Sequence, residues 1–504
     1  MLAHIATFAL EGVDSREVTV EVDVRAGLPG FAVVGLPDAA VREARERVRA
    51  AILNSGLEFP LKRLTANLAP AHVRKAGPSF DLALAVALLA ASDQLPPEQL
   101  ESCAVCGELS LGGDLRPVRG AVAIAFGARE AGYRRLIVPA ENAEEAALVE
   151  GIQVLGAPSL QRLVDLFSGR WTAPVPEVGS GPRAVTAAAR LDLGEVRGQE
   201  DARRALEIAA AGGHNLLMVG PPGAGKTMLA RRLPGILPPP SMDEALEITR
   251  IYSVAGLGDG TLVADRPFRA PHHTISAPGL VGGGSTPRPG EITLAHRGVL
   301  FLDELAEFSR PALEALRQPL EEGFVKVTRG QRTLTFPAGA MLVAACNTCP
   351  CARPPESCTC TPSDIARYAR RLSAPLIDRI DLVCQLDAAP QLSPAGAAPE
   401  CSGSVRARVL AARELQEQRF ADAGIRTNAA MDARLTTEHV KLEPKVRRRL
   451  LAGHQAAPLT ARSHDRVLRL ARTIADLDGR ESVRLENVEE ALGYKLTAPM
   501  AVAA

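Results

Sequence analysis

Hydrophobic and polar positions change their spacing along the chain, and these changes separate strand-like from helical segments. In the N-terminal third, Glu17–Val24 alternates as a half-buried strand does, whereas Ser79–Ala91 is a nearly continuous apolar run of helical length. Asp38 can cap a further helix that runs as far as Leu53. Gly107–Gly120, with its glycines, is typical of a hairpin. Strands and helices mixed in this way predict an α/β domain.

Two linker-like segments interrupt these patterns and give the expected domain boundaries. Residues 169–189 are rich in Pro, Gly and Ser, and residues 388–404 are rich in Ala and Pro. We therefore expect an N-terminal domain over 1–168, a core over 190–387 and a helical C-terminal domain over 405–504. A chain of 504 residues is too long for one hydrophobic core, which agrees with several domains.

Composition and charge narrow the functional class. The chain is 46% hydrophobic and 23% charged, with no run long enough to span a membrane. Its first residues lack a basic region followed by an apolar one, so we expect no signal peptide and a cytoplasmic protein without membrane contact. Its 58 basic and 58 acidic residues give a formal net charge of zero. Contact with a polyanion such as DNA must therefore come from a local basic surface.

The most specific motif follows Asn215–Val219, an apolar run typical of a buried strand. The next eight residues match the phosphate-binding loop G-x-x-x-x-G-K-[ST]; they are Gly220, Pro221, Pro222, Gly223, Ala224, Gly225, Lys226 and Thr227. Lys226 would reach the β- and γ-phosphates and Thr227 would hold Mg²⁺. A glycine-rich turn before a helix is the alternative, and the strand–loop–helix context disfavours it. The sequence predicts binding of a nucleoside triphosphate, with ATP and Mg²⁺ as cofactors.

Polar residues end two more predicted strands. The apolar run from Gly298 ends in Asp303 and Glu304. Asp303 would hold the Mg²⁺ ion through water, and Glu304 would act as general base toward the attacking water. A third strand, Ala340–Ala345, precedes Asn347, which can orient that water or contact the γ-phosphate. The alternatives are an ordinary acidic strand end for the carboxylates and a turn residue for Asn347.

Two arginines complete the candidate nucleotide site. Arg379 lies just before a predicted strand, and Arg462 opens a predicted helix. In ATPases of this kind, arginines stabilise the charge that develops on the transferred phosphoryl group. A surface ion pair is the alternative for each.

Together these motifs resemble the AAA+ ATPases, in the branch that contains magnesium chelatase subunits and the MCM helicases, and within it the ComM/YifB family. The resemblance covers nearly the whole chain; besides the phosphate loop and Gly298–Glu304 it is carried by Val196–Gln199, Arg269–Ser276, Gly282–Gly284, Pro289–Glu291 and Leu376–Asp381. It implies a P-loop NTPase core, with helices on both faces of a parallel sheet, and a C-terminal helical lid.

The resemblance also implies roles for three residues. Asn347 looks like sensor 1, Arg379 like the finger that reaches a neighbour's ATP, and Arg462 like sensor 2. A finger that acts on a neighbour implies self-association into a ring, which in this family is a homo-hexamer.

A basic hairpin is expected between Phe324 and Phe336. Apolar and polar residues alternate there, and Lys326, Arg329 and Arg332 supply positive charge, with no acid before Asn347. One hairpin carries little charge, but six in a ring would form a basic collar suited to single-stranded or branched DNA. The alternative is a hairpin whose basic residues only keep its tip exposed to water.

The insertion Ser253–Gly290 also interrupts the nucleotide core and carries the pair His272 and His273. Adjacent histidines can bind a metal, but no HExxH-type spacing supports that interpretation. A structured loop is expected, and the resemblance places such an insertion along the central pore.

Four cysteines lie just after Asn347. Cys349, Cys351, Cys358 and Cys360 form the pattern C-x-C-x₆-C-x-C. Four thiolates so close in sequence can hold a tetrahedral Zn²⁺ ion and fix the loop. The one-residue spacing is tighter than the usual two-residue zinc knuckle, and free buried thiols are the alternative.

The N-terminal domain resembles the Lon protease domain, which has a ribosomal S5 domain 2-like fold. Gly77–Ser79 and Gly107–Val118 carry this resemblance, and Ser79 falls where that family keeps its nucleophile. A serine nucleophile needs a base, and Val122 stands at the apparent position of the Lon lysine. The sequence therefore predicts a domain without peptidase activity.

These observations predict an ATP-hydrolysing hexameric DNA motor, a helicase or branch-migration enzyme. By the family resemblance it would act on recombination intermediates in natural transformation. The alternative is a chelatase-type ATPase that remodels a partner protein. Both would carry the same nucleotide site, and the basic hairpin favours DNA.

Overall fold

The computed structural model describes residues 1–35, 38–73, 75, 77–176, 191–284, 287–329, 332–353, 357–372, 374–387, 399–448 and 460–494. These residues form two compact units. The first comprises Met1–Ala184, Met242–Ala264 and Thr328–Thr335, and the second comprises Val185–Ser241, Asp265–Val327 and Phe336–Ala504. Most of the first predicted linker, and 388–398 of the second, lie outside the described residues. No helix among the described residues is both long and apolar enough to cross a membrane.

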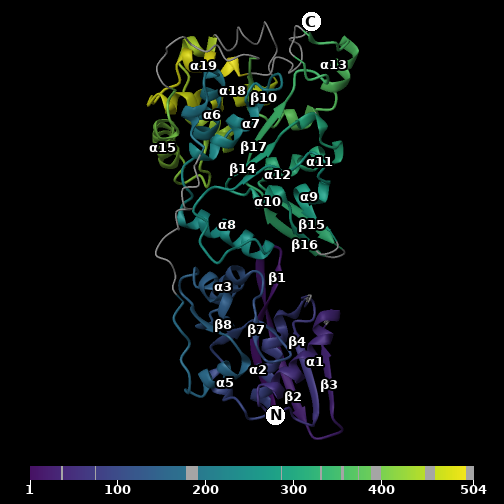
Figure 1. The fold of residues 1–504 in the computed structure, drawn as a ribbon. Coiled ribbons are helices and arrows are strands. Elements are labelled where there is room, and N and C mark those ends of the chain that lie inside the picture. The colour runs from purple at the N-terminus through teal and green to yellow at the C-terminus, as the bar shows by residue number, and fades with distance from the viewer. Residues whose placement is uncertain are drawn as a thin grey trace. The chain divides into compact units, whose positions relative to one another are not determined.

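The first unit is built on a seven-stranded mixed sheet in the order β3-β4-β2-β1-β5-β8-β9 (Figure 1). Its strands are β1 (Leu2–Glu11), β2 (Asp14–Arg25), β3 (Gly30–Val34), β4 (Arg63–Ala69), β5 (Cys103–Val105), β8 (Arg135–Pro139) and β9 (Gln153–Ala157). β1 and β2 form an antiparallel hairpin, whereas β1, β5, β8 and β9 pair in parallel. The predicted strand Glu17–Val24 is thus confirmed as part of β2.

Helices cover both faces of this sheet, because successive residues of a strand point to opposite sides. On β1, Ile5 belongs to a core with α1 (Ala39–Asn54), α2 (Asp81–Ala91) and α5 (Leu160–Phe167), while Ala6 belongs to a second core with α3 (Ala121–Glu130) and α4 (Ala143–Ala146). Every residue of α2 is buried, which explains why its sequence is apolar all round.

Two local predictions in this unit are confirmed. Asp38 caps α1, since its carboxylate accepts a hydrogen bond from the Val41 amide at 2.9 Å. The predicted hairpin Gly107–Gly120 contains β6 (Glu108–Leu109) and β7 (Leu115–Arg116), which pair antiparallel.

Helix α8 (Met242–Ala255) belongs to the first unit although its sequence follows the phosphate loop. The Arg250 guanidinium lies 3.0 Å from the Asp14 carboxylate, and Gly120 donates a backbone hydrogen bond to the Ser253 carbonyl at 3.1 Å. The predicted insertion Ser253–Gly290 is therefore divided, since its first residues, up to Ala264, pack with the N-terminal fold.

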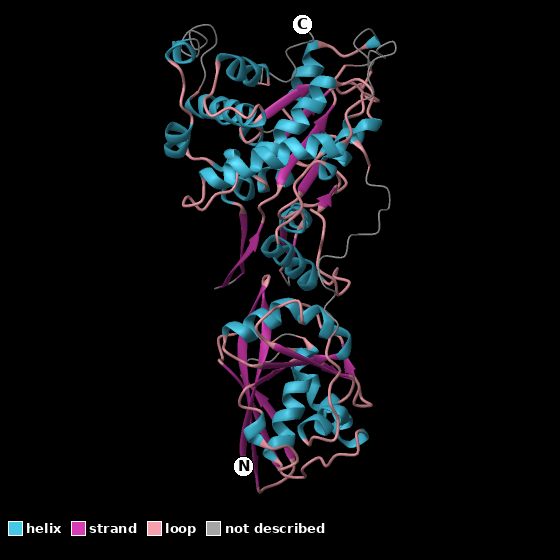
Figure 2. Cartoon of the chain, turned by 90° about the vertical axis from the view of Figure 1, so that its left-hand side faces the viewer, coloured by secondary structure: helices cyan, strands magenta, loops and turns pink. Residues whose placement is uncertain are grey.

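The second unit is built on a five-stranded parallel sheet in the order β11-β14-β17-β10-β18. Its strands are β10 (Leu216–Val219), β11 (Phe268–Arg269), β14 (Val299–Leu302), β17 (Met341–Cys346) and β18 (Leu382–Gln385). β10, β14 and β17 are buried along their whole length, as expected of a parallel sheet covered by helices (Figure 2).

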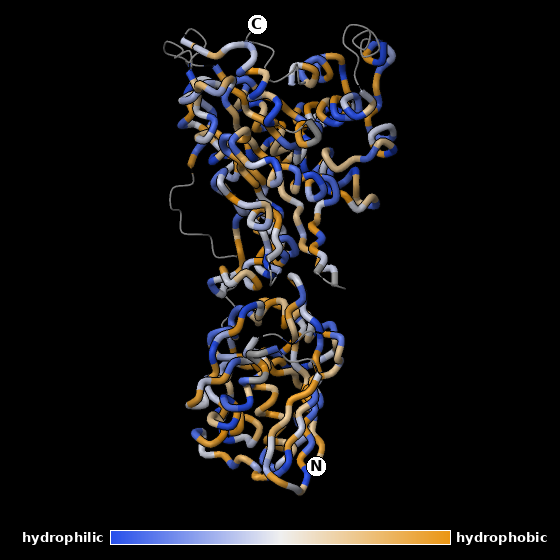
Figure 3. Tube along the Cα trace, turned by 90° about the vertical axis from the view of Figure 1, so that its right-hand side faces the viewer, coloured by the Kyte–Doolittle hydropathy of each residue, from blue (hydrophilic) through white to orange (hydrophobic). Residues whose placement is uncertain are grey.

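The C-terminal part of the second unit is helical, as predicted. α15 (Ser402–Arg419), α18 (Ala461–Leu477) and α19 (Leu485–Gly493) share one hydrophobic core with α6 (Glu200–Gly212) and the sheet. Figure 3 shows that hydrophobic and hydrophilic stretches alternate along the helices and strands of the chain.

Candidate functional site

The phosphate loop connects the carboxyl end of β10 to α7 (Lys226–Arg232), as the sequence predicts. Gly223 and Gly225 adopt φ values of 79° and 92°, which glycine reaches without strain. A side chain at Gly220 would bring its Cβ within 2.8 Å of the Leu386 carbonyl. The glycines are thus required by the backbone of the loop itself.

Lys226 starts α7 and is almost fully buried. Its ammonium group donates to the carbonyls of Gly220 at 2.6 Å and Pro221 at 2.8 Å, and to Oδ1 of Asn347 at 3.1 Å. Burial lowers the pKa of Lys226, while the nearby acidic groups of Cys346, Asp303 and Glu304 act in the opposite direction. Asn347 lies just after β17, the strand next to β10, and the structure brings these two predicted residues into contact.

Thr227 and Asp303 also meet at this edge of the sheet. The Thr227 hydroxyl donates to Oδ2 of Asp303 at 2.6 Å. Asp303 and Glu304 follow β14, which is separated from β10 by β17 alone. Glu304 adopts a left-handed backbone with φ of 52°, and its amide donates to Oδ1 of Asp303 at 3.0 Å. A left-handed backbone is uncommon for residues other than glycine, and such conformations cluster at active sites.

The sequence did not predict the neighbour of Glu304. Nδ1 of His273 lies 3.5 Å from Oε2 of Glu304, and the rings of His272 and His273 lie 4.1 Å apart. The histidines come after β11, which pairs with β14, so the strand order brings them to the acidic strand end. Only that strand order, which the sequence does not specify, would have revealed this contact.

Arg379 and Arg462 converge on a carboxylate that the sequence analysis missed. Glu321, at the end of α12 (Arg317–Glu322), accepts from Arg379 at 2.6 Å and from Arg462 at 2.7 Å. Hydrogen bonds from Arg379 and then Arg462 lower the pKa of Glu321. Glu321 thus joins the two arginines through ion pairs, and their roles toward ATP stay predictions.

The backbone of Arg379 is anchored at the end of β10 opposite to the phosphate loop. Asn215, just before β10, donates through Nδ2 to the Arg379 carbonyl at 2.9 Å and accepts at Oδ1 from Leu342 at 2.8 Å. Gly220 follows β10 at its other end. A strand rises roughly 3.3 Å per residue, so five residues separate the two ends by about 16 Å.

The four cysteines form a cluster. Sγ of Cys349 lies 3.3 Å from that of Cys351 and 3.6 Å from that of Cys358, and Cys351 and Cys358 are 3.7 Å apart. All four sulfur atoms, including that of Cys360, lie within 4.8 Å of one another. Ligands at about 2.3 Å around a tetrahedral ion would be about 3.8 Å apart, so the cluster fits Zn²⁺ in size and chemistry.

The predicted DNA-binding hairpin is present as β15 (Phe324–Arg329) and β16 (Arg332–Pro337). Lys326 is exposed, and its ammonium lies 4.9 Å from the centroid of the Phe324 ring. The side chains of Arg329 and Arg332, and the turn between them, lie outside the described residues. Their contact with DNA stays a prediction.

In the first unit, Ser79 lies in the 3₁₀ turn Pro78–Phe80 before α2, and its carbonyl accepts from the Gly107 amide at 3.1 Å. Val122, at the position expected for a Lon-type lysine, is fully buried in α3. An aliphatic side chain there cannot accept a proton, and the absence of peptidase activity stays a prediction.

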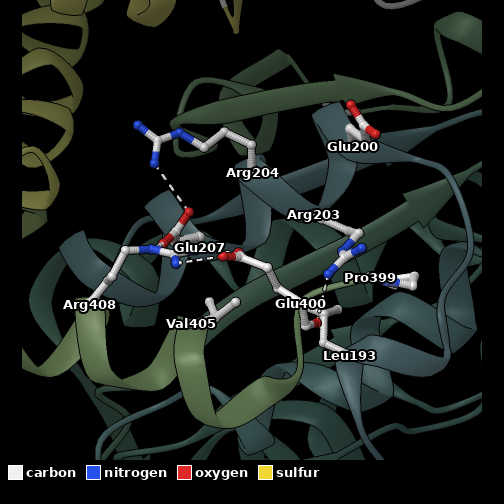
Figure 4. A pocket seen from close by; sticks show the side chains of 9 residues that line it. All are labelled: Leu193, Glu200, Arg203, Arg204, Glu207, Pro399, Glu400, Val405 and Arg408. Atoms are coloured by element: carbon white, nitrogen blue, oxygen red, sulfur yellow. Dashed lines mark hydrogen bonds and ion pairs between the residues drawn. The ribbon is translucent and has the colours of Figure 1, made fainter. Parts of the chain in front are cut away.

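A pocket of about 340 Å³ lies between α6 and α15 (Figure 4). Its lining is largely charged: Leu193, Glu200, Arg203, Arg204, Glu207, Pro399, Glu400, Val405 and Arg408. Glu207 pairs with Arg204 at 3.1 Å and also with Arg408, which lies 2.7 Å from Glu400. The pair between Glu207 and Arg408 joins α6 to α15.

Comparison with family models covers most of the chain. The model described as magnesium chelatase, subunit ChlI, matches residues 192–393, its C-terminal counterpart matches 399–495, and a further model of subunit ChlI matches 20–142. The first match contains the phosphate loop, Asp303, Glu304 and the cysteine cluster.

Relatives match nearly end to end. A protein named YifB from Escherichia coli (strain K12) is 43% identical over 498 residues, covering 98% of this chain and 97% of that protein. Competence protein ComM of Haemophilus influenzae is 43% identical over 503 residues, with the same coverage of both chains. Lon protease 2 of Bacillus subtilis is 31% identical over 137 residues, a quarter of each chain. The chain therefore belongs to the ComM/YifB family of magnesium-chelatase-like AAA+ proteins.

Proposed function

We propose that this protein is an ATP-hydrolysing ring motor that moves along DNA and acts on branched recombination intermediates during natural transformation. The observation that carries the proposal is the composite nucleotide site, in which Lys226 meets Asn347 while Thr227 meets Asp303. The AAA+ family membership supports ATP hydrolysis. The name of the competence protein among its relatives supports a role in competence and natural transformation.

Each residue of the site has a distinct task in phosphoryl transfer. The amides of the phosphate loop and the Lys226 ammonium would bind the phosphates, and Thr227 and Asp303 would hold Mg²⁺, which neutralises charge on the β- and γ-phosphates. Glu304 would accept a proton from the attacking water, which Asn347 would orient. The proposal therefore requires ATP and Mg²⁺ as cofactors. A structural Zn²⁺ ion in the cysteine cluster would be the third.

A ring explains the placement of the two arginines. The backbone of Arg379 is tied to the amino end of β10, about 16 Å along the strand from Gly220, and its guanidinium pairs with Glu321, which favours a role toward a neighbouring subunit. A neighbour packed head-to-tail can receive this arginine, and repetition of that contact closes a ring. By the family resemblance this ring is a homo-hexamer, with the C-terminal helices as its lid.

The DNA part of the proposal rests on the hairpin of β15 and β16. A chain of zero net charge can bind a polyanion only through a local basic surface, and a ring would gather the basic residues of several copies at one place. Six copies of Lys326, Arg329 and Arg332 around a channel would contact phosphates without reading bases.

The deciding experiment measures the ATPase rate without DNA and with single-stranded, duplex, forked or four-way DNA. Stimulation by branched or single-stranded DNA, with strand displacement, is expected. An unchanged ATPase rate with every DNA would contradict the proposed motor.

The second candidate is a chelatase-type ATPase that remodels a partner protein, which the magnesium chelatase family matches favour. Its signature would be stimulation by a protein and not by DNA.

A further inference from the structure

The cysteine cluster closes the loop that joins Asn347 to the next helix. Cys349 and Cys351 come just after β17, and Cys358 and Cys360 come just before α13 (Pro362–Ala369). An ion bound by all four thiolates would tie the end of the strand to the start of the helix. The position of α13 relative to Asn347 would then depend on the metal.

The start of α13 is itself well defined. Thr361 and Asp364 form a capping box, in which the Thr361 hydroxyl accepts from the Asp364 amide and the Asp364 carboxylate accepts from the Thr361 amide. Because Thr361 follows Cys360 directly, the position of the cluster fixes the position of the residue that caps the helix. α13 therefore begins at the cluster and not at a free loop.

Farther along, α13 returns to the nucleotide site at two places. Tyr368 is buried, which raises its pKa, and its hydroxyl lies close enough to the backbone of Asn347 to oppose that rise. Arg371, just after the helix, lies 2.9 Å from the carboxylate of Glu307 in the turn Leu305–Glu307. That turn follows Glu304 directly. One short helix thus contacts the segments that carry both Asn347 and Glu304.

We infer that the four cysteines bind one Zn²⁺ ion and that α13, anchored by it, is a strut that positions Asn347 and Glu304 for hydrolysis. The inference rests on the proposed ATPase function. Zn²⁺ is chosen because four thiolates in a tetrahedron are the usual structural zinc site. Tyr368 and Arg371 are positioning residues, since they act through Asn347 and the Glu304 turn.

The strut acts on hydrolysis more than on nucleotide binding. The phosphate loop joins β10 to α7, whereas the contacts of α13 named above are with the segments of Asn347 and Glu307. A shift of about 1 Å in groups that orient the attacking water can cost on the order of 100-fold in rate. Loss of the metal should therefore lower kcat roughly 10- to 100-fold and leave nucleotide affinity nearly unchanged.

The test begins with metal analysis of full-length protein purified without chelator, where about one equivalent of zinc is expected. Cys351→Ser combined with Cys358→Ser should abolish zinc binding, lower the DNA-free kcat and preserve affinity for a non-hydrolysable ATP analogue. Cys401→Ser is the matched control, because Cys401 is exposed and lies outside the cluster. Retained analogue binding also shows that the double variant has folded.

Tyr368→Phe provides a second variant that keeps the cysteines. It should retain zinc and analogue affinity yet lose kcat. Less than half an equivalent of zinc in the wild-type protein would overturn the metal site. A zinc-free variant with wild-type kcat, or a Tyr368→Phe variant with unchanged kcat, would overturn the strut. A wild-type protein that binds zinc and lacks ATPase activity would instead contradict the proposed function.

Discussion

The hydroxyl of Thr227 donates a hydrogen bond to Oδ2 of Asp303 over 2.6 Å. The two residues lie 76 positions apart in the chain. They come together because the strand that carries Asp303 is separated from the phosphate-loop strand by β17 alone. A hydroxyl and a carboxylate in contact at the carboxyl end of a parallel sheet are the ligands that Mg²⁺ uses in P-loop ATPases.

Asp303→Asn should remove the charge that holds Mg²⁺ while keeping an oxygen that can accept from Thr227. We expect ATPase activity to fall by about 100-fold or more, since charge stabilisation at such sites is worth that much. Glu322→Gln removes an exposed carboxylate from α12 and should leave the rate unchanged. The measurement is the ATPase rate over a Mg²⁺ titration, and full recovery of Asp303→Asn at high Mg²⁺ would argue for a weaker, indirect role.

Lys226→Ala should abolish ATP hydrolysis and DNA unwinding. The buried ammonium that now bonds Asn347 and two loop carbonyls would be lost, and nothing on the alanine can contact the phosphates. Thermal melting is the check that the variant remains folded. DNA-stimulated hydrolysis by this variant would refute the assignment of the site.

Subunit mixing tests whether Arg379 serves a neighbour. Arg379→Ala and Lys226→Ala should each be inactive alone. Mixed at equal amounts and allowed to exchange, they should form some sites with an intact Lys226 from one subunit and an intact Arg379 from the next, about one quarter at random. If Arg379 acted within its own subunit, no site in the mixture would be whole, and activity would stay absent. The same experiment with Arg462→Ala tests whether Arg462, the other arginine that pairs with Glu321, also serves a neighbouring subunit.

Much of this site was predictable from sequence, because the local sequence around each motif indicates its structure. The phosphate loop, the acidic strand end and Asn347 each follow an apolar strand, so every one of them is fixed by residues beside it. His273 and Glu321 were missed because their significance depends on which strands and helices are neighbours. A histidine after a two-residue strand and a glutamate at a helix end carry no signal of their own.

The fold shows the same division. The α/β character and the helical C-terminal region could be predicted from the spacing of hydrophobic residues along the chain. The packing of α8 with the N-terminal fold does not, since it depends on contacts such as Arg250 with Asp14, which are more than 200 residues apart. Long-range pairing of this kind leaves no mark on local hydrophobic spacing.

Arg47→Ala should weaken the N-terminal unit. Arg47 bonds the carboxylate of Asp81 with two nitrogens, at 2.7 and 2.9 Å, and the Asp81 side chain is fully buried. Burial raises the pKa of Asp81, and the guanidinium opposes that rise. Removing the arginine would leave a buried carboxylate without its charged partner, at a cost of about 3–5 kcal/mol.

Native-state hydrogen exchange of the α2 amides measures this cost without requiring the whole chain to unfold in one step. The double variant Arg47→Ala with Asp81→Asn should recover much of the lost stability, since no charge then remains buried. Equal opening free energies for the single and double variants would show that packing of the arginine, and not the unpaired carboxylate, is responsible.

Arg329→Ala and Arg332→Ala should weaken DNA binding equally for unrelated sequences. Phosphate contacts carry no base information, and each one lost on a single strand should reduce the slope of log affinity against log salt by about 0.7. Arg434→Ala is the matched control, because Arg434 is an exposed arginine paired with Glu438 on α16 (Ala433–His439). Affinities for two single strands of different sequence, measured from low to high salt, separate the outcomes. A loss confined to one sequence would mean that the arginines contact bases, whereas an unchanged slope would place the DNA contact elsewhere on the protein.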